Sequence, residues 1–347
     1  MAEKLQDTTD VQPGQHDVHR LMTMVRGYMD AQVVRAVARL GLADHLAAGP
    51  LDLDALTGLL DANRDALARF LDACVALGLV ERAGDRYAIT PLGALLRSDG
   101  WSVRDMVLAS TGPALYYPWA RLDAAVRTGH AQMREAVGLE LWEYLRSNRE
   151  EGEIFARWMG GMTADAGRVV VESCDMARFR QIVDVGGSHG VLLAWLLAAA
   201  PDAHGVLFDR PEVIPDATRA IAEQGLSDRV TLVAGDFLEQ VPAGADLYVL
   251  KSVLCDWDDE HCARILASCH AAAPAGATLL VVDRVRPDDP GSFLHVTDIG
   301  MLAYSGGSFR REEHLRELVE RAGFDVRSVR SSASKSVPWT VLEARRV

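Results

Sequence analysis

The segment Ile182-Val-Asp-Val-Gly-Gly-Ser-His-Gly190 is the strongest indication of the fold of this chain. A short apolar run, typical of a buried strand, leads into a glycine-rich turn, and the apolar residues 191–200 then predict a helix. Glycine lets the backbone of such a turn approach a ligand closely, and the free N–H groups at the start of a helix attract anionic groups. The order strand, turn, helix therefore predicts a ligand-binding α/β unit.

The glycine spacing in this turn excludes two common phosphate-binding loops. The dinucleotide fingerprint needs glycines at positions 186, 188 and 191, but Ser188 and Val191 occupy two of these positions. A Walker A loop needs Gly-Lys-Ser/Thr, which does not follow. What remains is a turn suited to a nucleoside without a pyrophosphate.

The rest of the C-terminal half has the pattern of an α/β domain. Short apolar runs alternate with helical segments from Gln181 onward, and the runs are 182–185, 205–208, 230–233, 246–250 and 278–282. This alternation predicts a mainly parallel sheet covered by helices on both faces. We place the boundary near residues 176–181, which gives domains of residues 1–178 and 179–347.

Acidic residues follow the second and third predicted strands. Asp209 comes about 20 residues after the glycine-rich turn, where a carboxylate can accept hydrogen bonds from both hydroxyls of a ribose. Asp236 can accept from the exocyclic amine of adenine, with Phe237 covering the face of the ring. Because ligands of open α/β sheets bind at the carboxyl ends of the strands, these residues and the turn together predict a nucleoside site.

The N-terminal half is mainly helical. Residues 18–45 predict a helix with a wide apolar face, which either a partner subunit or the chain's own core covers. Residues 51–95 predict two helices and a hairpin, the order of a winged helix. Such a unit serves DNA binding or packing and dimerisation, and the acidic second helix favours the latter. Residues 100–178 predict further helices, whose aromatic residues form a core or line a pocket.

Charge and cysteine content argue against several functional classes. The 347 residues include 36 basic and 49 acidic ones, and this formal net charge of −13 disfavours nucleic-acid binding. The five cysteines include no C-x-x-C pair, which disfavours a disulfide scaffold or a metal site such as zinc. Cys262 and Cys269 form a helical stripe with Ile265 and Leu266, so we expect both in the core.

We expect a cytoplasmic protein without membrane contact. The longest apolar run, residues 191–200, falls far short of the roughly 20 residues that span a bilayer. Residues 1–10 are polar and show no apolar segment of the kind found in a signal peptide.

A further segment, Leu250-Lys-Ser-Val-Leu-Cys-Asp-Trp-Asp-Asp259, makes the pattern specific. Together with Asp-Val-Gly-Gly-x-x-Gly, Phe-Asp-Arg-Pro and Gly-Asp-Phe, in this order, it resembles the signature of metal-independent, S-adenosylmethionine-dependent small-molecule O-methyltransferases. These include plant caffeic-acid-type enzymes and bacterial enzymes that tailor aromatic polyketides. The resemblance covers nearly the whole chain, including Gly306-Gly307 before the C-terminal helix. It implies a C-terminal Rossmann-like α/β methyltransferase domain, an N-terminal, mostly helical winged-helix dimerisation domain, and a homodimer.

The resemblance also implies which residues bind the cofactor, S-adenosyl-L-methionine. It places Gly186 against the methionine part, Asp209 at the ribose, and Asp236 and Phe237 at the adenine. Thr163 falls where the family has a hydroxyl near the cofactor's carboxylate. The other residues that we assign to this site line it or flank these positions: Arg210, Gly235, Lys251, Ser252 and Trp257.

The sequence departs from the family at the catalytic base. The family has a histidine directly before Asp-Trp, and here that position is Cys255. The two acidic residues that orient the histidine fall near Asp283, which stays acidic, and near Phe309, which does not. A thiol has a reference pKa of about 8.5, so Cys255 is a poor base at pH 7 unless its thiolate is stabilised.

Four mechanisms stay open at this point. Cys255 acts as a weak base, or another residue takes the proton, or proximity alone suffices for an in-line methyl transfer, or the fold runs different chemistry. We favour proximity and orientation. The residues that we assign to the catalytic site are Cys255, Asp256, Asp283 and His295, with Asp298 as a further proton acceptor to consider.

The expected activity is O-methylation of a hydroxyl on an aromatic, polyketide-type small molecule in secondary metabolism, such as antibiotic biosynthesis. The substrate is either free or tethered to a carrier or coenzyme A, and we expect it against helices from about 140–165 and 294–305. Two alternatives remain. One is hydroxylation or decarboxylation on the same cofactor-binding fold, and the other is a DNA-binding regulator that uses the winged helix.

Overall fold

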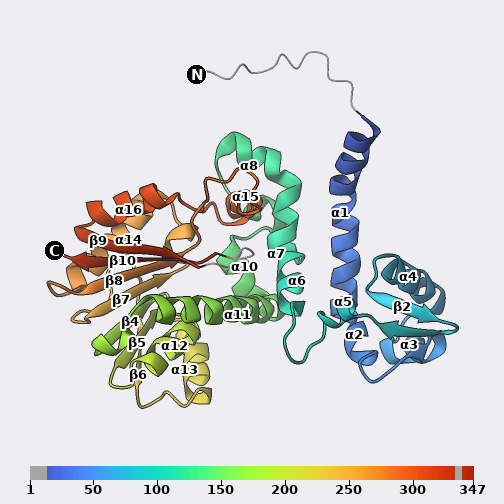
Figure 1. Cartoon of the computed structure of the whole chain (residues 1–347), viewed down its shortest axis with the longest axis horizontal. Coiled ribbons are helices and arrows are strands. Elements are labelled where there is room, and N and C mark those ends of the chain that lie inside the picture. The colour runs from blue at the N-terminus through green and yellow to red at the C-terminus, as the bar shows by residue number, and fades with distance from the viewer. Residues whose placement is uncertain (1–13, 333–337) are drawn as a thin grey trace. The chain divides into compact units, whose positions relative to one another are not determined.

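A computed structural model describes residues 14–332 and 338–347 of this chain. The chain forms two compact units that divide between Gly112 and Pro113 (Figure 1). The boundary expected after residue 178 lies inside the second unit, because α11 (Arg149–Ser173) packs along α12 (Val191–Ala199). A Cβ atom at Gly167 of α11 would lie 2.7 Å from Cγ of Trp195 on α12, so this glycine permits the close packing.

The first unit consists of helices and a small antiparallel sheet. α1 (Gln15–Leu40) ends at Gly41, whose φ of 64° breaks the helix that the sequence predicts over residues 18–45. The predicted order of two helices and a hairpin is present. The further elements are α2 (Leu42–His45), β1 (Leu51–Asp52), α3 (Leu53–Leu60), α4 (Arg64–Ala76), β2 (Val80–Ala83), β3 (Arg86–Ile89), α5 (Pro91–Ala94) and α6 (Arg104–Ser110).

The second unit begins with a helical segment and continues into a seven-stranded sheet. Its first elements are α7 (Pro113–Tyr116), η1 (Tyr117–Arg121), α8 (Leu122–Thr128), α9 (Met133–Val137), α10 (Leu141–Ser147), α11 and η2 (Met176–Arg178). The α/β part follows with β4 (Gln181–Val185), α12, β5 (His204–Asp209), α13 (Ile214–Glu223), β6 (Val230–Ala234), β7 (Leu247–Lys251), η3 (Leu254–Asp256), α14 (Asp259–Ala272) and β8 (Thr278–Asp283). It ends with α15 (Leu294–Tyr304), α16 (Glu312–Arg321), β9 (Phe324–Ser331) and β10 (Thr340–Arg346).

The strand order in this sheet is β6-β5-β4-β7-β8-β10-β9. Strands β4 to β8 pair in parallel, as the alternation of strands and helices predicts, and β10 pairs antiparallel with both β8 and β9. The order reverses between β4 and β7, so the chain leaves the two strands in opposite directions. Ligands of open α/β sheets bind at such a point.

Helices cover both faces of the sheet, and the strand residues divide between two cores (Figure 1). On one face, Val183 and Val185 pack with residues of α14 and α16. On the other face, Ile182 packs with residues of α11, α12 and α13. Parallel strands buried on both faces are expected to be almost continuously apolar, and β8 is buried along its whole length. Cys262 and Cys269 are fully buried in the first core, as predicted.

No helix among residues 14–332 and 338–347 is long and apolar enough to cross a membrane.

Candidate active site

The glycine-rich turn and the acid after β5 form one hydrogen-bonded unit. Gly186 has a φ of 74°, and its N–H donates to the carbonyl oxygen of Phe208 at 2.8 Å. The Asp209 carboxylate accepts from the N–H of Ser188 at 2.8 Å and from that of Arg210 at 2.7 Å. Burial raises the pKa of Asp209, and these two N–H donors counteract that shift. The structure therefore brings the predicted ribose acceptor onto the predicted turn.

The residues predicted to hold a purine form a second group. Gly235 donates its N–H to the carbonyl oxygen of Asp209 at 3.0 Å, and a Cβ at Gly235 would lie 2.5 Å from Cε2 of Phe208. Asp236 is exposed, and its carboxylate accepts from the N–H of Leu238. The rings of Phe237 and Trp257 meet edge to face with their centroids 6.0 Å apart. Trp257, from the loop after β7, thus lies beside the residues that follow β6.

Lys251 and Thr163 contact each other although they lie on different elements. Lys251 at the end of β7 donates from Nζ to Oγ1 of Thr163 on α11 at 2.8 Å. Burial lowers the pKa of Lys251, while Cys255 and nearby carboxylates favour its charged form. The next residue, Ser252, adopts a positive φ of 52° and donates its N–H to the carbonyl oxygen of Val282. The strained Ser252 marks the point where the chain leaves the sheet and enters the loop that carries Cys255.

Asp184 is a buried carboxyl that our reading of the sequence did not single out. It belongs to β4 and is 2% exposed, and its Oδ2 has no hydrogen-bond partner among the described residues. Burial raises its pKa to about 7, opposed by the charge of Lys251. An acidic residue within the apolar stretch Ile182–Val185 is the signal that could have identified it.

Cys255 lies in η3, and its buried thiol interacts with the buried carboxyl of Asp283. Burial and the neighbouring carboxylates of Asp283 and Asp256 raise the pKa of this thiol well above its ordinary value. Burial also raises the pKa of Asp256 to about 7, with a further contribution from Asp283. At neutral pH the thiol is therefore protonated, whereas Asp256 titrates near pH 7.

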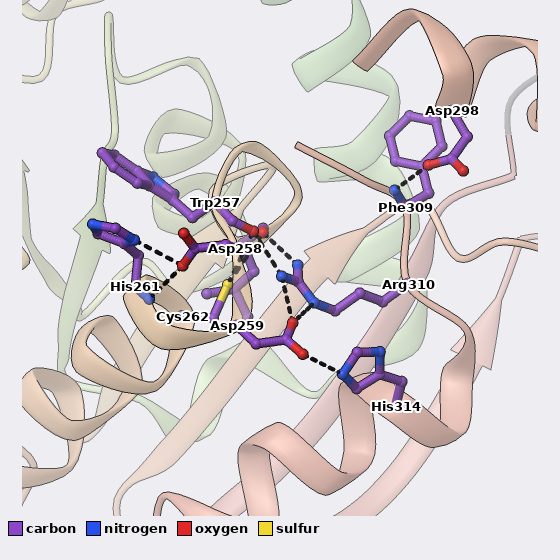
Figure 2. A network of polar contacts seen from close by, with 10 residues as sticks. Trp257, Asp258, Asp259, His261, Cys262, Asp298, Phe309, Arg310 and His314 are labelled. Atoms are coloured by element: carbon purple, nitrogen blue, oxygen red, sulfur yellow. Dashed lines mark hydrogen bonds and ion pairs between the residues drawn. The ribbon is translucent and has the colours of Figure 1, made fainter. Parts of the chain in front are cut away.

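A buried arginine anchors the loop that contains Cys255 (Figure 2). Arg310 is 6% exposed and donates to the carbonyl oxygens of Leu254 and Trp257, each at 2.6 Å. Its Nε donates to Asp259 at 3.0 Å, and the other oxygen of Asp259 contacts Nε2 of His314 at 2.8 Å. These contacts hold both ends of the segment 254–257 against α14 and α16. No sequence pattern distinguishes Arg310 from the other basic residues.

The segment after α15 approaches the same loop from another side. The N–H of Ser308 donates to the carbonyl oxygen of Cys255 at 2.8 Å. A Cβ at Gly307 would lie 2.0 Å from that oxygen, so the close approach needs glycine here. Phe309 is buried against Cys255, and its N–H donates to Asp298 at 2.6 Å (Figure 2). The ring of Phe309 therefore fills the position where the family has the second acidic residue that orients its histidine.

His295 makes its contact outside this cluster. Its Nε2 contacts the carbonyl oxygen of Asp289, in the loop before α15, at 3.0 Å. The buried α15 residues that cluster with Cys255 are Leu294 and Met301, and Tyr304 packs against the same cluster. The structure thus groups three of the four predicted catalytic residues, Cys255, Asp256 and Asp283, and leaves His295 in a local contact. Within the described residues, no group of three or more His, Cys, Asp or Glu side chains is arranged to hold a metal ion.

Comparison with known proteins identifies relatives along nearly the whole chain. The O-methyltransferase domain profile matches residues 119–325, and the O-methyltransferase dimerisation domain profile matches residues 22–99. The 3-amino-4-hydroxybenzoate 4-O-methyltransferase of Streptomyces cremeus is 39% identical over 89% of this chain and 86% of its own. The aclacinomycin 10-hydroxylase of Streptomyces purpurascens is 30% identical over 95% of this chain and 90% of its own.

Solved structures of such proteins share the fold. An O-methyltransferase from neocarzinostatin biosynthesis, in complex with S-adenosylmethionine and 2-hydroxy-5-methyl naphthoic acid, superposes with a TM-score of 0.80. It is 31% identical and the match covers 92% of this chain and 96% of that one. The fold, the order of the site motifs and these matches agree. The chain therefore belongs to the O-methyltransferase family.

Proposed function

We propose that this protein transfers a methyl group from S-adenosyl-L-methionine to a hydroxyl of an aromatic small molecule in secondary metabolism. The observation that carries the proposal is the meeting of the Gly186 turn, Asp209 and the Phe237–Trp257 pair at one edge of the sheet. A turn, a carboxylate and two aromatic rings at this edge suit the amino-acid, ribose and adenine parts of the cofactor. The O-methyltransferase relatives support the same activity.

The residues present fit this cofactor. A carboxylate has about four acceptor positions, and the two N–H groups on Asp209 leave positions for ribose hydroxyls. Gly186 has no side chain to obstruct the turn, and the exposed Asp236 is available to an amine. Arg210, Gly235, Lys251, Ser252 and Thr163 complete the site that we propose, through the contacts described above. When bound, the cofactor supplies an electrophilic methyl group on sulfur.

The chain's own residues support a mechanism based on proximity and orientation. A thiol whose pKa is raised by burial is already protonated at neutral pH and cannot accept the substrate's proton. We therefore do not assign Cys255 as the base. Asp256 has a pKa of about 7, which is the range that suits a general base, and we propose it as the acceptor of any proton that the substrate must lose. Asp283 then serves to hold Cys255 and the η3 loop in place.

We also propose that the active form is a homodimer. The dimerisation domain profile covers residues 22–99, and α1 exposes apolar side chains along its first half. Leu21, Met24 and Val25 are each more than half exposed, whereas Val37 and Ala38 further along the helix are buried. Association would remove this apolar surface from water. One chain has a mass of 37.7 kDa, and sedimentation should give twice this mass. A substitution such as Leu21→Glu should weaken the dimer.

The direct test is incubation of the purified protein with S-adenosylmethionine and a panel of phenolic acids. We expect S-adenosylhomocysteine and a product heavier by one CH2 group. Tight binding of the cofactor without turnover of any phenol would contradict the transferase activity. The panel should also include substrates that carry a coenzyme A thioester, so that tethered and free substrates are compared.

A second candidate is hydroxylation or decarboxylation on the same fold. It is favoured by Cys255, which replaces the family's histidine, and by the 30% identical relative that is named as a hydroxylase. The mass of the product separates the activities, because hydroxylation adds one oxygen atom and decarboxylation removes carbon dioxide.

A further inference from the structure

Arg284 follows β8 directly and differs from the other arginines of this region in what its side chain contacts. Its Nη2 lies 3.2 Å from the sulfur of Met162, and its guanidinium lies 5.8 Å from the ring centre of Phe309 and 5.4 Å from that of Trp339. Its Nε is buried and has no hydrogen-bond partner among the described residues. By contrast, Arg310 donates to three oxygen acceptors.

This environment leaves much of the hydrogen-bonding capacity of the guanidinium unused. A guanidinium has five N–H donors, and sulfur is a weak acceptor. Aromatic faces attract the charge but do not replace an anion. Burial lowers the pKa of Arg284, which means that the protein surroundings disfavour its charge. Binding of an anionic oxygen to this side chain would offset that cost.

The surroundings of Arg284 belong to the proposed reaction centre. The groups that interact electrostatically with it include the thiol of Cys255, the carboxyl of Asp283, the hydroxyl of Tyr304 and a second cation, the ammonium of Lys251. That hydroxyl contacts the sulfur of Met301, and Met301 packs with Phe309 against Cys255. Arg284 therefore combines a positive charge with flat aromatic and soft sulfur surfaces, a combination that suits an aromatic ring bearing a carboxylate.

We propose that Arg284 binds the carboxylate of the substrate, and that the substrate is an aromatic hydroxy acid. This inference rests on the proposed methyl transfer and narrows the substrate class. The bound carboxylate would fix the orientation of the ring and so present the hydroxyl at the η3 loop. Arg284 is in this sense a specificity-determining residue.

The cofactor carries a carboxylate too, and Met162 precedes Thr163, which we place near that group. The test must therefore separate two sources of the same chemistry. Wild-type protein, Arg284→Gln, Arg284→Lys and the control Arg327→Gln would be assayed with matched pairs of an acid and its methyl ester. Suitable pairs are 3-amino-4-hydroxybenzoate and a hydroxynaphthoate, each beside its ester. Arg327 is an exposed arginine that pairs with Asp325 on β9.

We expect Arg284→Gln to lower kcat/KM for the acids by about 10- to 100-fold, the effect of losing one charge-assisted hydrogen bond. The esters should be unaffected by this change, and Arg284→Lys should recover part of the loss because it keeps the charge. Arg327→Gln should leave kcat/KM unchanged for both the acids and the esters. Calorimetric affinity for S-adenosylhomocysteine should stay the same in all variants.

Two results would overturn the proposal. Equal losses for acid and ester would mean that Arg284 only supports the local structure. Weaker binding of S-adenosylhomocysteine, with an unchanged ratio of acid to ester, would assign Arg284 to the cofactor's carboxylate instead. If the wild-type protein methylates neither the acids nor the esters, the transferase proposal fails. Calorimetric titration of acid and ester into the protein saturated with S-adenosylhomocysteine then still tests whether Arg284 binds the carboxylate.

Discussion

The guanidinium of Arg310 donates to the carbonyl oxygen of Trp257 at 2.6 Å, across 53 positions of the sequence. The same side chain holds Leu254 and Asp259, so one buried cation connects the segment after α15 with the η3 loop and the start of α14 (Figure 2). Carbonyl oxygens fixed in this way keep Asp256 and Trp257 in one arrangement. Arg310 is a positioning residue, because it contacts the backbone of Leu254 and Trp257 and the side chain of Asp259, not the rings and carboxylates that we expect to bind ligands.

Replacing Arg310 by leucine should destabilise the protein and the loop together. The change removes three hydrogen bonds and leaves the carbonyl oxygens of Leu254 and Trp257 with weaker donors, chiefly the thiol of Cys262. We expect this to lower the free energy of unfolding by about 3 kcal/mol. Urea unfolding measures this loss. Arg310→Lys should recover only part of it, because an ammonium lacks the planar fork. The neighbouring, more exposed Arg311→Leu is the control, and an effect as large as that of Arg310→Leu would contradict the role of the network.

Replacing Cys255 by alanine should have a small effect on turnover. The thiol is protonated at neutral pH because burial raises its pKa, so its removal should change kcat by less than about tenfold. Loss of a general base usually costs about 10²–10⁴. A loss of that size in a variant that keeps its fold, as judged by circular dichroism, would assign the proton to the thiol.

Placing a histidine at position 255 should not by itself restore a base. Phe309 occupies the position of the second orienting acid and is buried against Cys255, so a lone imidazole would lack one of its partners. We expect Cys255→His to reduce kcat and the combination with Phe309→Glu to recover part of that loss. The pH profile of kcat is the measurement, and a new ionisation near pH 6–7 in the single variant would contradict this expectation.

Asp184 should make the stability of the protein depend on pH. Its pKa is about 7 in the folded state, above the ordinary value of 3.8, so the unfolded chain loses this proton at lower pH than the folded chain does. The free energy of unfolding should therefore fall between about pH 4 and pH 7, by up to about 4 kcal/mol, and level off above pH 7.

Asp184→Asn removes this titration and tests the expectation. Urea midpoints from pH 4 to pH 8 should fall less steeply than in the wild type, and the variant should be the more stable protein at pH 7. Asp202→Asn, on the exposed turn after α12, is the matched control. An unchanged slope in Asp184→Asn would show that other groups cause the dependence.

Gly235→Ala should disturb the site through Phe208. The added Cβ would lie 2.5 Å from Cε2 of that ring, and crowding of this kind costs about 1–3 kcal/mol. Affinity for S-adenosylhomocysteine, measured by calorimetry, should fall together with stability. Gly161→Ala on α11 meets nothing within 4 Å and serves as the control. Combining Gly235→Ala with Phe208→Leu should restore part of the affinity, and failure to do so would contradict the proposed clash.

Much of the site was predictable because its residues follow strands. Gly186, Asp209 and Phe237 come at the carboxyl ends of β4, β5 and β6, and parallel pairing of these strands brings their ends to one edge. Local pattern was therefore sufficient for these positions. The same pattern missed β9 and β10, whose apolar and charged residues alternate less regularly and which pair antiparallel at the far side of the sheet.

Patterns and motifs along the chain were sufficient to predict the parallel sheet, the family, and the replacement of the catalytic histidine by Cys255. The tertiary structure was needed to place the thiol beside Asp283, to anchor the loop on Arg310 and to leave Nε of Arg284 without a hydrogen-bond partner among the described residues. The reason is that strand and helix patterns depend on neighbours along the chain. The charge state of a thiol or the partner of a guanidinium depends on burial and on groups brought together from distant positions.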